Sequence, residues 1–461
     1  MKKKIFFFSL SLFSAVAVVA QTSQPLYLDE SQPIEVRVQD ALSRMTLEEK
    51  VKLCTAQSKF SSHGVPRLGI PELWMSDGPH GVREEILWDS WGVAGFTNDS
   101  CTAFPALTCL AATWNPEMSA LYGKSIGEEA RYRRKDVLLA PGCNIYRTPF
   151  NGRNFEYLGE DPYLASVMVV PYVQELQKNG VAACVKHFAL NNQEKWRGHI
   201  DVDLSDRALY EIYLPAFKAA VQKGGAWSIM GAYNKIRGTH ACHNDLLLNR
   251  ILKGEWQFDG CVITDWGGAH DTREAVFNGL DIEMGTYTDG VAKNRDFAYD
   301  NYYLAKDYLK GLKDGTYPVS TVDEKAARIL RLIFRTAMNR NRPWGSFTSE
   351  AHYDAARRIG EEGIVLLKNE PVKSQKSPLL PIDASKYEKI LVVGDNATRY
   401  LSGGVGATTL KVKQDILPLE SLQEMYGDKI TYTQGYAAGK PRYGKVDRPK
   451  VNTDSLYRKA L

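Results

Sequence analysis

Short apolar runs alternate with longer amphipathic stretches from about residue 130 onward. The segments between the runs have helical periodicity, as in Asp206–Val221, where Leu209, Ile212, Tyr213 and Phe217 recur at helical spacing. The apolar runs are Asp136–Ala140, Val181–Val185, Trp227–Met230, Cys261–Thr264 and Leu280–Met284. Alternating strands and helices predict parallel βαβ units, and in one long domain they favour an α/β fold of the TIM-type (β/α)8 barrel class. We expect this barrel to span residues 21–338.

The first 20 residues have the pattern of a secretory signal peptide. A Lys-rich start is followed by an apolar run from Ile5 and by small residues that end at Ala20. The alternative is a membrane anchor, but the apolar run is shorter than the roughly 20 residues that a span requires. We therefore predict cleavage near Ala20, with no membrane association afterwards. The signal looks bacterial and indicates a periplasmic or secreted protein.

The charge balance argues against nucleic acid or an anionic membrane as a partner. The formal net charge of the 461 residues is +4, and without Lys2, Lys3 and Lys4 the chain keeps 55 Lys and Arg against 54 Asp and Glu. Oligomeric state is not indicated by the sequence.

Seven cysteines cannot form a closed disulfide framework, because the number is odd. Cys143, Cys184 and Cys261 lie in or beside apolar runs and are expected to be buried thiols, whereas Cys101 and Cys109 are a possible pair. The stretch from His240 to His243 superficially suggests a metal site, but nothing else has ligand spacing. We predict neither a metal nor a cofactor.

Polar and aromatic residues follow each predicted strand, at the end where a barrel places its chemistry. Asp77 follows an early apolar stretch, and the later runs lead into further residues of this kind. These are Asn144 and Arg147, Lys186 and His187, Tyr233 and Asn234, and Asp265 and Trp266. Every predicted strand therefore delivers such groups to one rim.

The residue types on this rim, with Arg153 added, suit a neutral polyhydroxylated ligand. Carboxylates and cationic donors bind vicinal hydroxyls, and aromatic faces cover the apolar side of a sugar ring. A phosphorylated metabolite would need a Gly-rich loop that leads into a helix, which the chain lacks. Each residue also has a purely structural interpretation: Asp77 as a turn residue, Asp265 as a helix cap and Lys186 as a partner of Glu194.

Five motifs resemble those of family 3 glycoside hydrolases, in the order and with the spacing of that family. They are DGPHGVR at Asp77–Arg83, RTPFNGRNFEYLGEDPYL at Arg147–Leu164, KHFALNNQE at Lys186–Glu194, IMGAYN at Ile229–Asn234 and ITDWG at Ile263–Gly267. The second motif is long and very specific. The resemblance covers roughly residues 30 to 440.

The resemblance implies a retaining, two-step hydrolysis of a β-glycoside with Asp265 as the nucleophile. It implies that Asp77 binds the distal hydroxyls of the terminal sugar and that Arg153, Lys186 and His187 bind the other ring hydroxyls. Tyr233 would orient the nucleophile and Trp266 would form part of the sugar-binding wall. Three acidic residues of the long motif, Glu156, Glu160 and Asp161, are structural in the family.

The sequence at Asp77 is similar to that of the β-glucosidases, and a β-xylosidase is the nearest alternative. The N-acetylglucosaminidase branch of the family uses an Asp-x-His loop, whereas His199-Ile-Asp201 has the reverse order. The expected substrate is therefore an oligosaccharide or a β-glucoside with terminal nonreducing β-D-glucose.

Beyond the barrel, the resemblance implies a linker at 339–353 and a partial α/β sandwich domain at 354–461. Ala355–Asn369 resembles the helix and strand that open this domain, and Lys389–Asn396 its next strand. Gly403-Gly404-Val405-Gly406 is a weak signal for a nucleotide loop. The family places its acid/base Glu further along, and we expect this chain to lack it. A noncatalytic glycan-binding remnant is therefore a further alternative.

Overall fold

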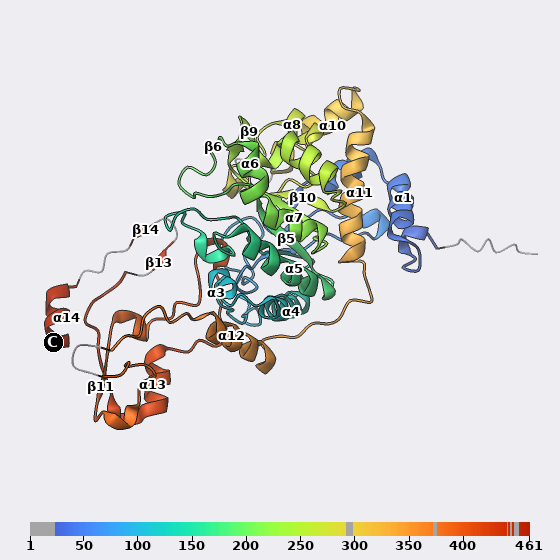
Figure 1. Ribbon diagram of the computed structural model, residues 1–461. Helices are drawn as coiled ribbons and strands as arrows, with labels where there is room; N and C mark the ends of the chain where they lie inside the picture. The colour runs from blue at the N-terminus through green and yellow to red at the C-terminus, as the bar shows by residue number, and fades with distance from the viewer. Residues whose placement is uncertain (1–23, 292–297, 372–375, 440, 443–444, 447–450) are drawn as a thin grey trace, which may run out of the picture.

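The computed structural model describes residues 24–291, 298–371, 376–439, 441–442, 445–446 and 451–461. The predicted signal peptide lies outside these residues. The larger body is a barrel with helices packed around it, and the residues after α11 (Val319–Arg335) form a smaller lobe (Figure 1). Among the described residues, no helix combines the length and the apolar character that crossing a bilayer requires.

A parallel five-stranded sheet forms most of the barrel wall. Its order is β10-β7-β5-β4-β3, and the strands are β3 (Met75–Asp77), β4 (Val137–Leu139), β5 (Ala182–Phe188), β7 (Ser228–Gly231) and β10 (Cys261–Thr264). Every residue of these five strands is buried. Parallel strands covered on both faces are expected to be continuously apolar, which explains why the apolar runs located them.

The ring closes through shorter pieces of extended chain. Ile282 bridges β10, and Glu283 bridges Thr55 just before β1 (Ala56–Ser58). Strand β2 (Ser61–Ser62) pairs antiparallel with β1 and bridges Trp74 beside β3. The TIM-type barrel is thus confirmed, with β2 as a reversed strand in the wall.

Helices cover the outside of the barrel. They are α1 (Ile34–Arg44), α2 (Leu47–Leu53), α3 (Leu107–Ala112), α4 (Pro116–Tyr132), α5 (Pro162–Lys178), α7 (Pro215–Gln222), α8 (Thr272–Phe277), α10 (Lys306–Lys313) and α11 (Val319–Arg335). The first turn of α5 shows how the sequence starts a helix. Asp161 accepts hydrogen bonds from the backbone N–H groups of Tyr163 and Leu164, and Pro162 occupies the first helical position.

The predicted helix Asp206–Val221 is divided into three pieces. They are α6 (Asp206–Ala208), a π-helical turn at Leu209–Tyr213 and α7, which starts at Pro215. Proline cannot donate its backbone hydrogen bond inside a helix, and the π turn shifts the helical phase. As a result Leu209, Tyr213 and Phe217 are buried, whereas Ile212 is exposed.

The smaller lobe begins with α12 (Glu350–Gly363), which packs against α3 and α4. This helix starts inside the range predicted as a linker, because Ser349 caps it by accepting from the N–H of His352. Strands β11 (Ile390–Val393) and β12 (Ile430–Thr433) form a parallel pair beside α13 (Pro418–Tyr426), and α14 (Thr453–Ala460) follows. The strand expected after α12 is not formed: Ile364–Leu367 is exposed and has no regular structure.

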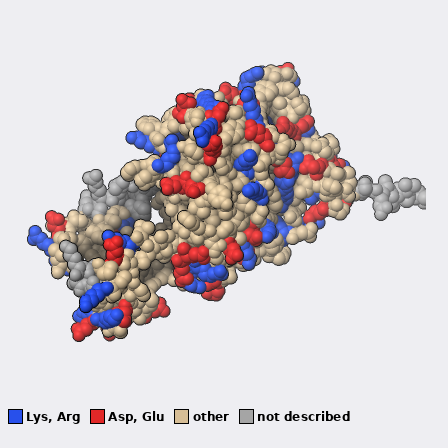
Figure 2. Space-filling view, viewed as in Figure 1, with Lys and Arg blue, Asp and Glu red and all other residues tan. Residues whose placement is uncertain are grey.

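All seven cysteines are free thiols, so the possible Cys101–Cys109 pair is not formed. Six of them are buried, including Cys143, Cys184 and Cys261. Lys, Arg, Asp and Glu are interspersed over the face of the molecule in Figure 2, without a large patch of one sign.

Candidate active site

A cavity of about 470 Å³ lies at the carboxyl ends of the barrel strands. All seven predicted site residues line it: Asp77, Arg153, Lys186, His187, Tyr233, Asp265 and Trp266. Asp77 ends β3, Lys186 and His187 lie near the end of β5, and Asp265 directly follows β10. The parallel arrangement of these strands therefore collects side chains that lie almost 190 residues apart in sequence.

Asp265 is buried, with one carboxylate oxygen bonded and the other free. Its Oδ1 accepts from the backbone N–H of Trp266 at 2.9 Å. Its Oδ2 is shielded from solvent, has no hydrogen-bond partner and lies 3.7 Å from Nε2 of His187. The neighbouring helix α8 is capped by Asp271, so Asp265 does not serve as its cap. A carboxylate oxygen that lies beside a cavity and has no hydrogen-bond partner is available to an incoming ligand.

His187 is held in one orientation by its neighbours. Its Nδ1 lies 3.0 Å from the hydroxyl of Tyr157, which itself accepts from Asn191 Nδ2 at 3.2 Å. A neutral ring that accepts the hydroxyl hydrogen of Tyr157 at Nδ1 carries its own proton on Nε2, on the side of Asp265. Burial, with Arg153 nearby, lowers the pKa of His187 well below its ordinary value, so the ring is neutral.

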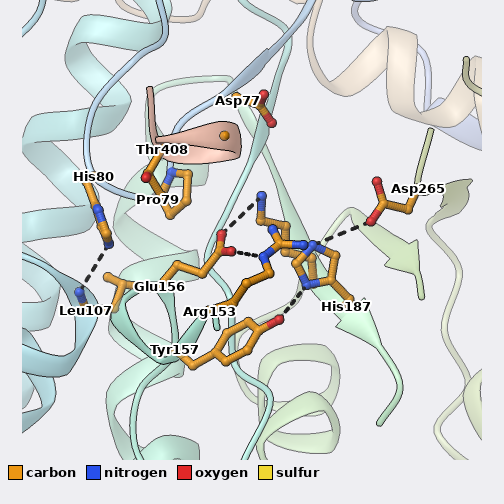
Figure 3. A network of polar contacts seen from close by, with 12 residues as sticks. Asp77, Pro79, His80, Leu107, Arg153, Glu156, Tyr157, His187, Asp265 and Thr408 are labelled. Carbon is orange, nitrogen blue, oxygen red and sulfur yellow. Dashed lines mark hydrogen bonds and ion pairs between the residues drawn. The ribbon is translucent and has the colours of Figure 1, made fainter. Parts of the chain in front are cut away.

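Two buried cations share the carboxylate of Glu156. Arg153 donates from Nε to Glu156 Oε1 (Figure 3). Lys186 Nζ lies 3.7 Å from Oε2. Burial acts to lower the pKa of Arg153, but the charge of Glu156 raises it well above the ordinary value. Glu156 thus has the structural role expected of it. Lys186 pairs with Glu156 rather than with Glu194, which contacts Arg153 and Arg197 instead.

Asp77 lies across the cavity and is paired with a residue of its own motif. Its Oδ2 accepts from Arg83 Nη1 at 3.0 Å, and the same nitrogen donates to the carbonyl of Gly406 at 3.1 Å. Burial raises the pKa of Asp77, while the charges of Lys186 and Arg83 oppose the shift. Because it ends a strand and faces the cavity, Asp77 is more than a turn residue.

Trp266 and Tyr233 are fixed through backbone carbonyls. The indole of Trp266 donates to the carbonyl of Lys59 at 2.7 Å, and the Tyr233 hydroxyl donates to the carbonyl of Trp266 at 3.0 Å. Tyr233 thus holds the peptide between Trp266 and Gly267, one residue beyond Asp265. The guanidinium of Arg197 lies 4.4 Å from the centre of the Tyr233 ring.

Two other residues that were predicted on the rim do not line the cavity. Asn144 exchanges two hydrogen bonds with the backbone of His187, at 2.8 and 2.9 Å, and so fixes the end of β5. Arg147 is exposed and does not line the cavity, because it lies over the ring of Tyr213 instead.

Several lining residues were not predicted. Arg83 and Arg197 lie within or just after motifs already singled out, but Trp91 and Asp289 carry no local signal. The cavity is also lined by Val405, Gly406, Ala407 and Thr409 of the smaller lobe. The glycine-rich stretch at 403–406 thus contributes a wall of this cavity. Among the residues that the structure describes, no group of three or more His, Cys, Asp or Glu side chains is arranged to hold a metal ion.

The relatives of the chain are glycoside hydrolases. The beta-glucosidase BoGH3A of Bacteroides ovatus is 66% identical over 98% of this chain and 61% of its own length. The thermostable beta-glucosidase B of Acetivibrio thermocellus is 35% identical over 87% of this chain and 50% of its own. The chain therefore spans about half to three-fifths of these curated relatives.

The fold has solved counterparts. Beta-glucosidase 3B from Thermotoga neapolitana in complex with glucose matches with a TM-score of 0.76 at 34% identity. The match covers 86% of this chain and 55% of that one. Residues 43–332 match the model of the glycosyl hydrolase family 3 N-terminal domain. With that match over most of the barrel, the chain belongs to glycosyl hydrolase family 3.

Proposed function

We propose that this chain is a retaining β-glucosidase that releases terminal nonreducing β-D-glucose, with Asp265 as the nucleophile. The observation that carries the proposal is the Asp265 carboxylate, in which one oxygen accepts from the backbone N–H of Trp266 and the other has no hydrogen-bond partner beside the cavity. The names of the relatives support a β-glucoside as substrate.

In the first step, Oδ2 of Asp265 attacks the anomeric carbon, and the bond between that carbon and the leaving oxygen breaks with its electron pair on the oxygen. The product is a covalent glycosyl ester on Asp265. In the second step, water attacks the anomeric carbon, the ester bond to Oδ2 breaks with its electron pair on Oδ2, and the water gives up one proton to solvent. This proton balances the one that the leaving oxygen takes up from solvent after the first step. A carboxylate suits both steps because it is an anion at neutral pH and a good leaving group.

The remaining cavity groups are assigned to binding. Arg153, Lys186, His187 and Asp77 present donors and acceptors for ring hydroxyls, and Trp266 supplies an aromatic wall. Among the described residues, the other carboxylates that line the cavity are Asp77, Glu156 and Asp289, and each is paired with a cation. None of these three is therefore assigned as the general acid.

Trapping of the covalent intermediate tests the proposal. The chain is incubated with dinitrophenyl 2-deoxy-2-fluoro-β-glucoside, whose leaving group needs little help from an acid, and is examined by intact-mass and peptide mass spectrometry. We expect one fluoroglucosyl group on Asp265. Asp265→Asn should take up no label, whereas the exposed control Asp206→Asn should be labelled as fast as the parent chain.

The outcomes separate the proposal from its alternatives. Labelling by the xylose analogue at a higher rate would make the chain a β-xylosidase. Glucose binding by a folded chain that neither reagent labels would favour a noncatalytic glycan-binding protein.

We also propose that the protein is exported, to the periplasm or beyond, after cleavage near Ala20. The support is the Lys-rich, then apolar, then small-residue pattern of residues 1–20. N-terminal sequencing of the protein expressed in a bacterium should find Gln21 as the first residue. A retained Met1 would contradict export.

A further inference from the structure

A loop beside the cavity carries an unusual density of exposed apolar side chains. Ile86 and Val93 bridge its base, and four large apolar residues of this loop have about half of their surface exposed: Leu87, Trp88, Val93 and Phe96. A fifth, Trp91, is 40% exposed and lines the cavity. Exposed apolar surface beside a binding site is commonly a contact surface for a ligand or partner.

Trp91 is held in place by contacts around its ring. Its indole N–H donates to Asp289 Oδ1 at 3.2 Å, and its ring meets that of Phe60 edge to face at 5.8 Å. The cationic groups of Lys59 and Arg83 lie 4.6 and 5.1 Å from the ring centre. A rim side chain with this many contacts is preorganised, and preorganisation lowers the cost of binding.

The support for Trp91 includes a buried charge. Lys59 is 1% exposed, and its Nζ lies 2.5 Å from Asp289 Oδ2 and 2.7 Å from Thr286 Oγ1. Burial acts to lower the pKa of Lys59, and the hydrogen bond to Asp289 opposes this shift. A buried ion pair contributes little net stability, because desolvation offsets the attraction. Its effect here is to fix Asp289, and through Asp289 the indole.

Depth in the cavity separates the part of a substrate that reacts from the part that leaves. Asp77, Lys186, His187 and Asp265 are all more than nine-tenths buried, whereas Trp91 stands at the rim. A glucosyl unit seated on the buried groups extends outward through the substituent at its anomeric carbon. This substituent is the aglycone, the group that departs when Asp265 attacks.

We propose that Trp91 is the contact surface for the aglycone and selects leaving groups with an apolar ring face. An aryl group and the C–H side of a second pyranose both present such a face, and aromatic contacts of this kind are specific in geometry. The inference rests on the proposed function, since it assigns the outer part of the same site. Trp91 acts on binding and not on the chemistry at Asp265.

Two trapping reagents with the same sugar and different leaving groups test this role. One is dinitrophenyl 2-deoxy-2-fluoro-β-glucoside, whose leaving group has an aromatic ring. The other is 2-deoxy-2-fluoro-β-glucosyl fluoride, whose leaving group is a single fluoride and has no ring for Trp91 to contact. For Trp91→Ala we expect the apparent dissociation constant of the dinitrophenyl reagent to rise roughly five- to tenfold. The constant for the fluoride should stay within about twofold, and so should the labelling rate at saturation.

Two further variants keep the result interpretable. Trp344→Ala removes an equally large but remote side chain that is 85% exposed, and it should change neither constant. Trp91→Phe keeps an aromatic ring and loses the N–H that bonds Asp289, so its apparent dissociation constant for the dinitrophenyl reagent should lie close to that of the parent chain. If Trp91→Ala does not fold, the comparison is made with Trp91→Phe.

The outcomes separate the role of Asp265 as the nucleophile from the role of Trp91 in binding the aglycone. Failure of both reagents to label the parent chain would overturn the proposed function itself. Labelling of the parent chain, combined with equal changes for both reagents or none for either in Trp91→Ala, would overturn the role of Trp91 and leave Asp265 as the nucleophile.

Discussion

At the scale of single residues, the site depends on hydrogen bonds that leave one reactive atom unbonded. The hydroxyl of Tyr157 contacts Nδ1 of His187 and accepts from Asn191, while Oδ2 of Asp265 has no hydrogen-bond partner among the described residues. Asp77, Lys186, His187 and Asp265 were predictable because each lies at or just after the end of an apolar run. Tyr157 was not singled out, because its role depends on contacts with residues 30 and 34 positions away.

Tyr157→Phe should lower the rate of Asp265 labelling about tenfold. The variant leaves Nδ1 of His187 and the amide of Asn191 short of a buried partner, which should cost about 1–3 kcal/mol of unfolding free energy. Kinetics of labelling and urea unfolding measure the two effects. The matched control is Tyr172→Phe, because the buried hydroxyl of Tyr172 has no hydrogen-bond partner. An equal loss of rate in both variants would contradict the assigned role of Tyr157.

At the scale of elements, helix α12 is attached to the barrel through a histidine between two carboxylates. Nδ1 of His352 lies 2.9 Å from Glu129 and Nε2 lies 2.9 Å from Glu128, both on α4. Burial acts to lower the pKa of His352, but hydrogen bonds to Glu129 and Glu128 raise it above the ordinary value of 6.5. Both ring nitrogens can then donate, which suits the imidazolium form.

Stability should therefore depend on pH through His352. A pKa that is raised by folding contributes stability that is fully present below the ordinary pKa and is lost as the pH rises through the folded value. We expect the free energy of unfolding to fall as the pH increases from about 6.5 into the alkaline range. His352→Gln should remove this part of the pH dependence in urea titrations. The same slope in the variant and the parent chain would exclude His352 as its origin.

The elements show where sequence patterns succeed and where they fail. The five parallel strands of the wall are buried on both faces, so their apolar runs locate them. Strand β2 is two serines and has no apolar signal, so its reversed direction could not be predicted. Ile364–Leu367 has the composition of a strand, but no strand pairs with it among the residues that the structure describes. Extended chain persists only when its backbone groups are paired.

At the scale of the whole molecule, a segment of the smaller lobe completes the cavity. The chain around 403–412 reaches the barrel, where Val412 bridges Cys101 and Leu410 is buried. Lys411 Nζ lies 2.8 Å from Asp99 and also donates to the carbonyl of Phe96. This contact between the smaller lobe and the barrel could not be predicted, because it joins positions more than 300 residues apart in sequence.

Lys411→Met should weaken glucose binding roughly three- to tenfold, because it removes charge-assisted hydrogen bonds worth about 1–3 kcal/mol and loosens the wall at 405–409. Inhibition of labelling by glucose measures the effect. Lys413→Met is the matched control, because Lys413 contacts Cys101 through its backbone and is exposed. Equal inhibition constants in both variants would show that the wall holds without Lys411.

The free thiols bear on how the protein can be handled. Because the cysteines form no disulfide, folding should need no oxidant, and reducing agents should not weaken the protein. Burial raises the pKa of all seven thiols, but six of them are buried, whereas Cys109 is only partly buried. A single maleimide dye should therefore attach at α3, where Sγ of Cys109 lies close to Gly363 at the end of α12. Such a dye would report, in real time, whether the smaller lobe stays attached to the barrel.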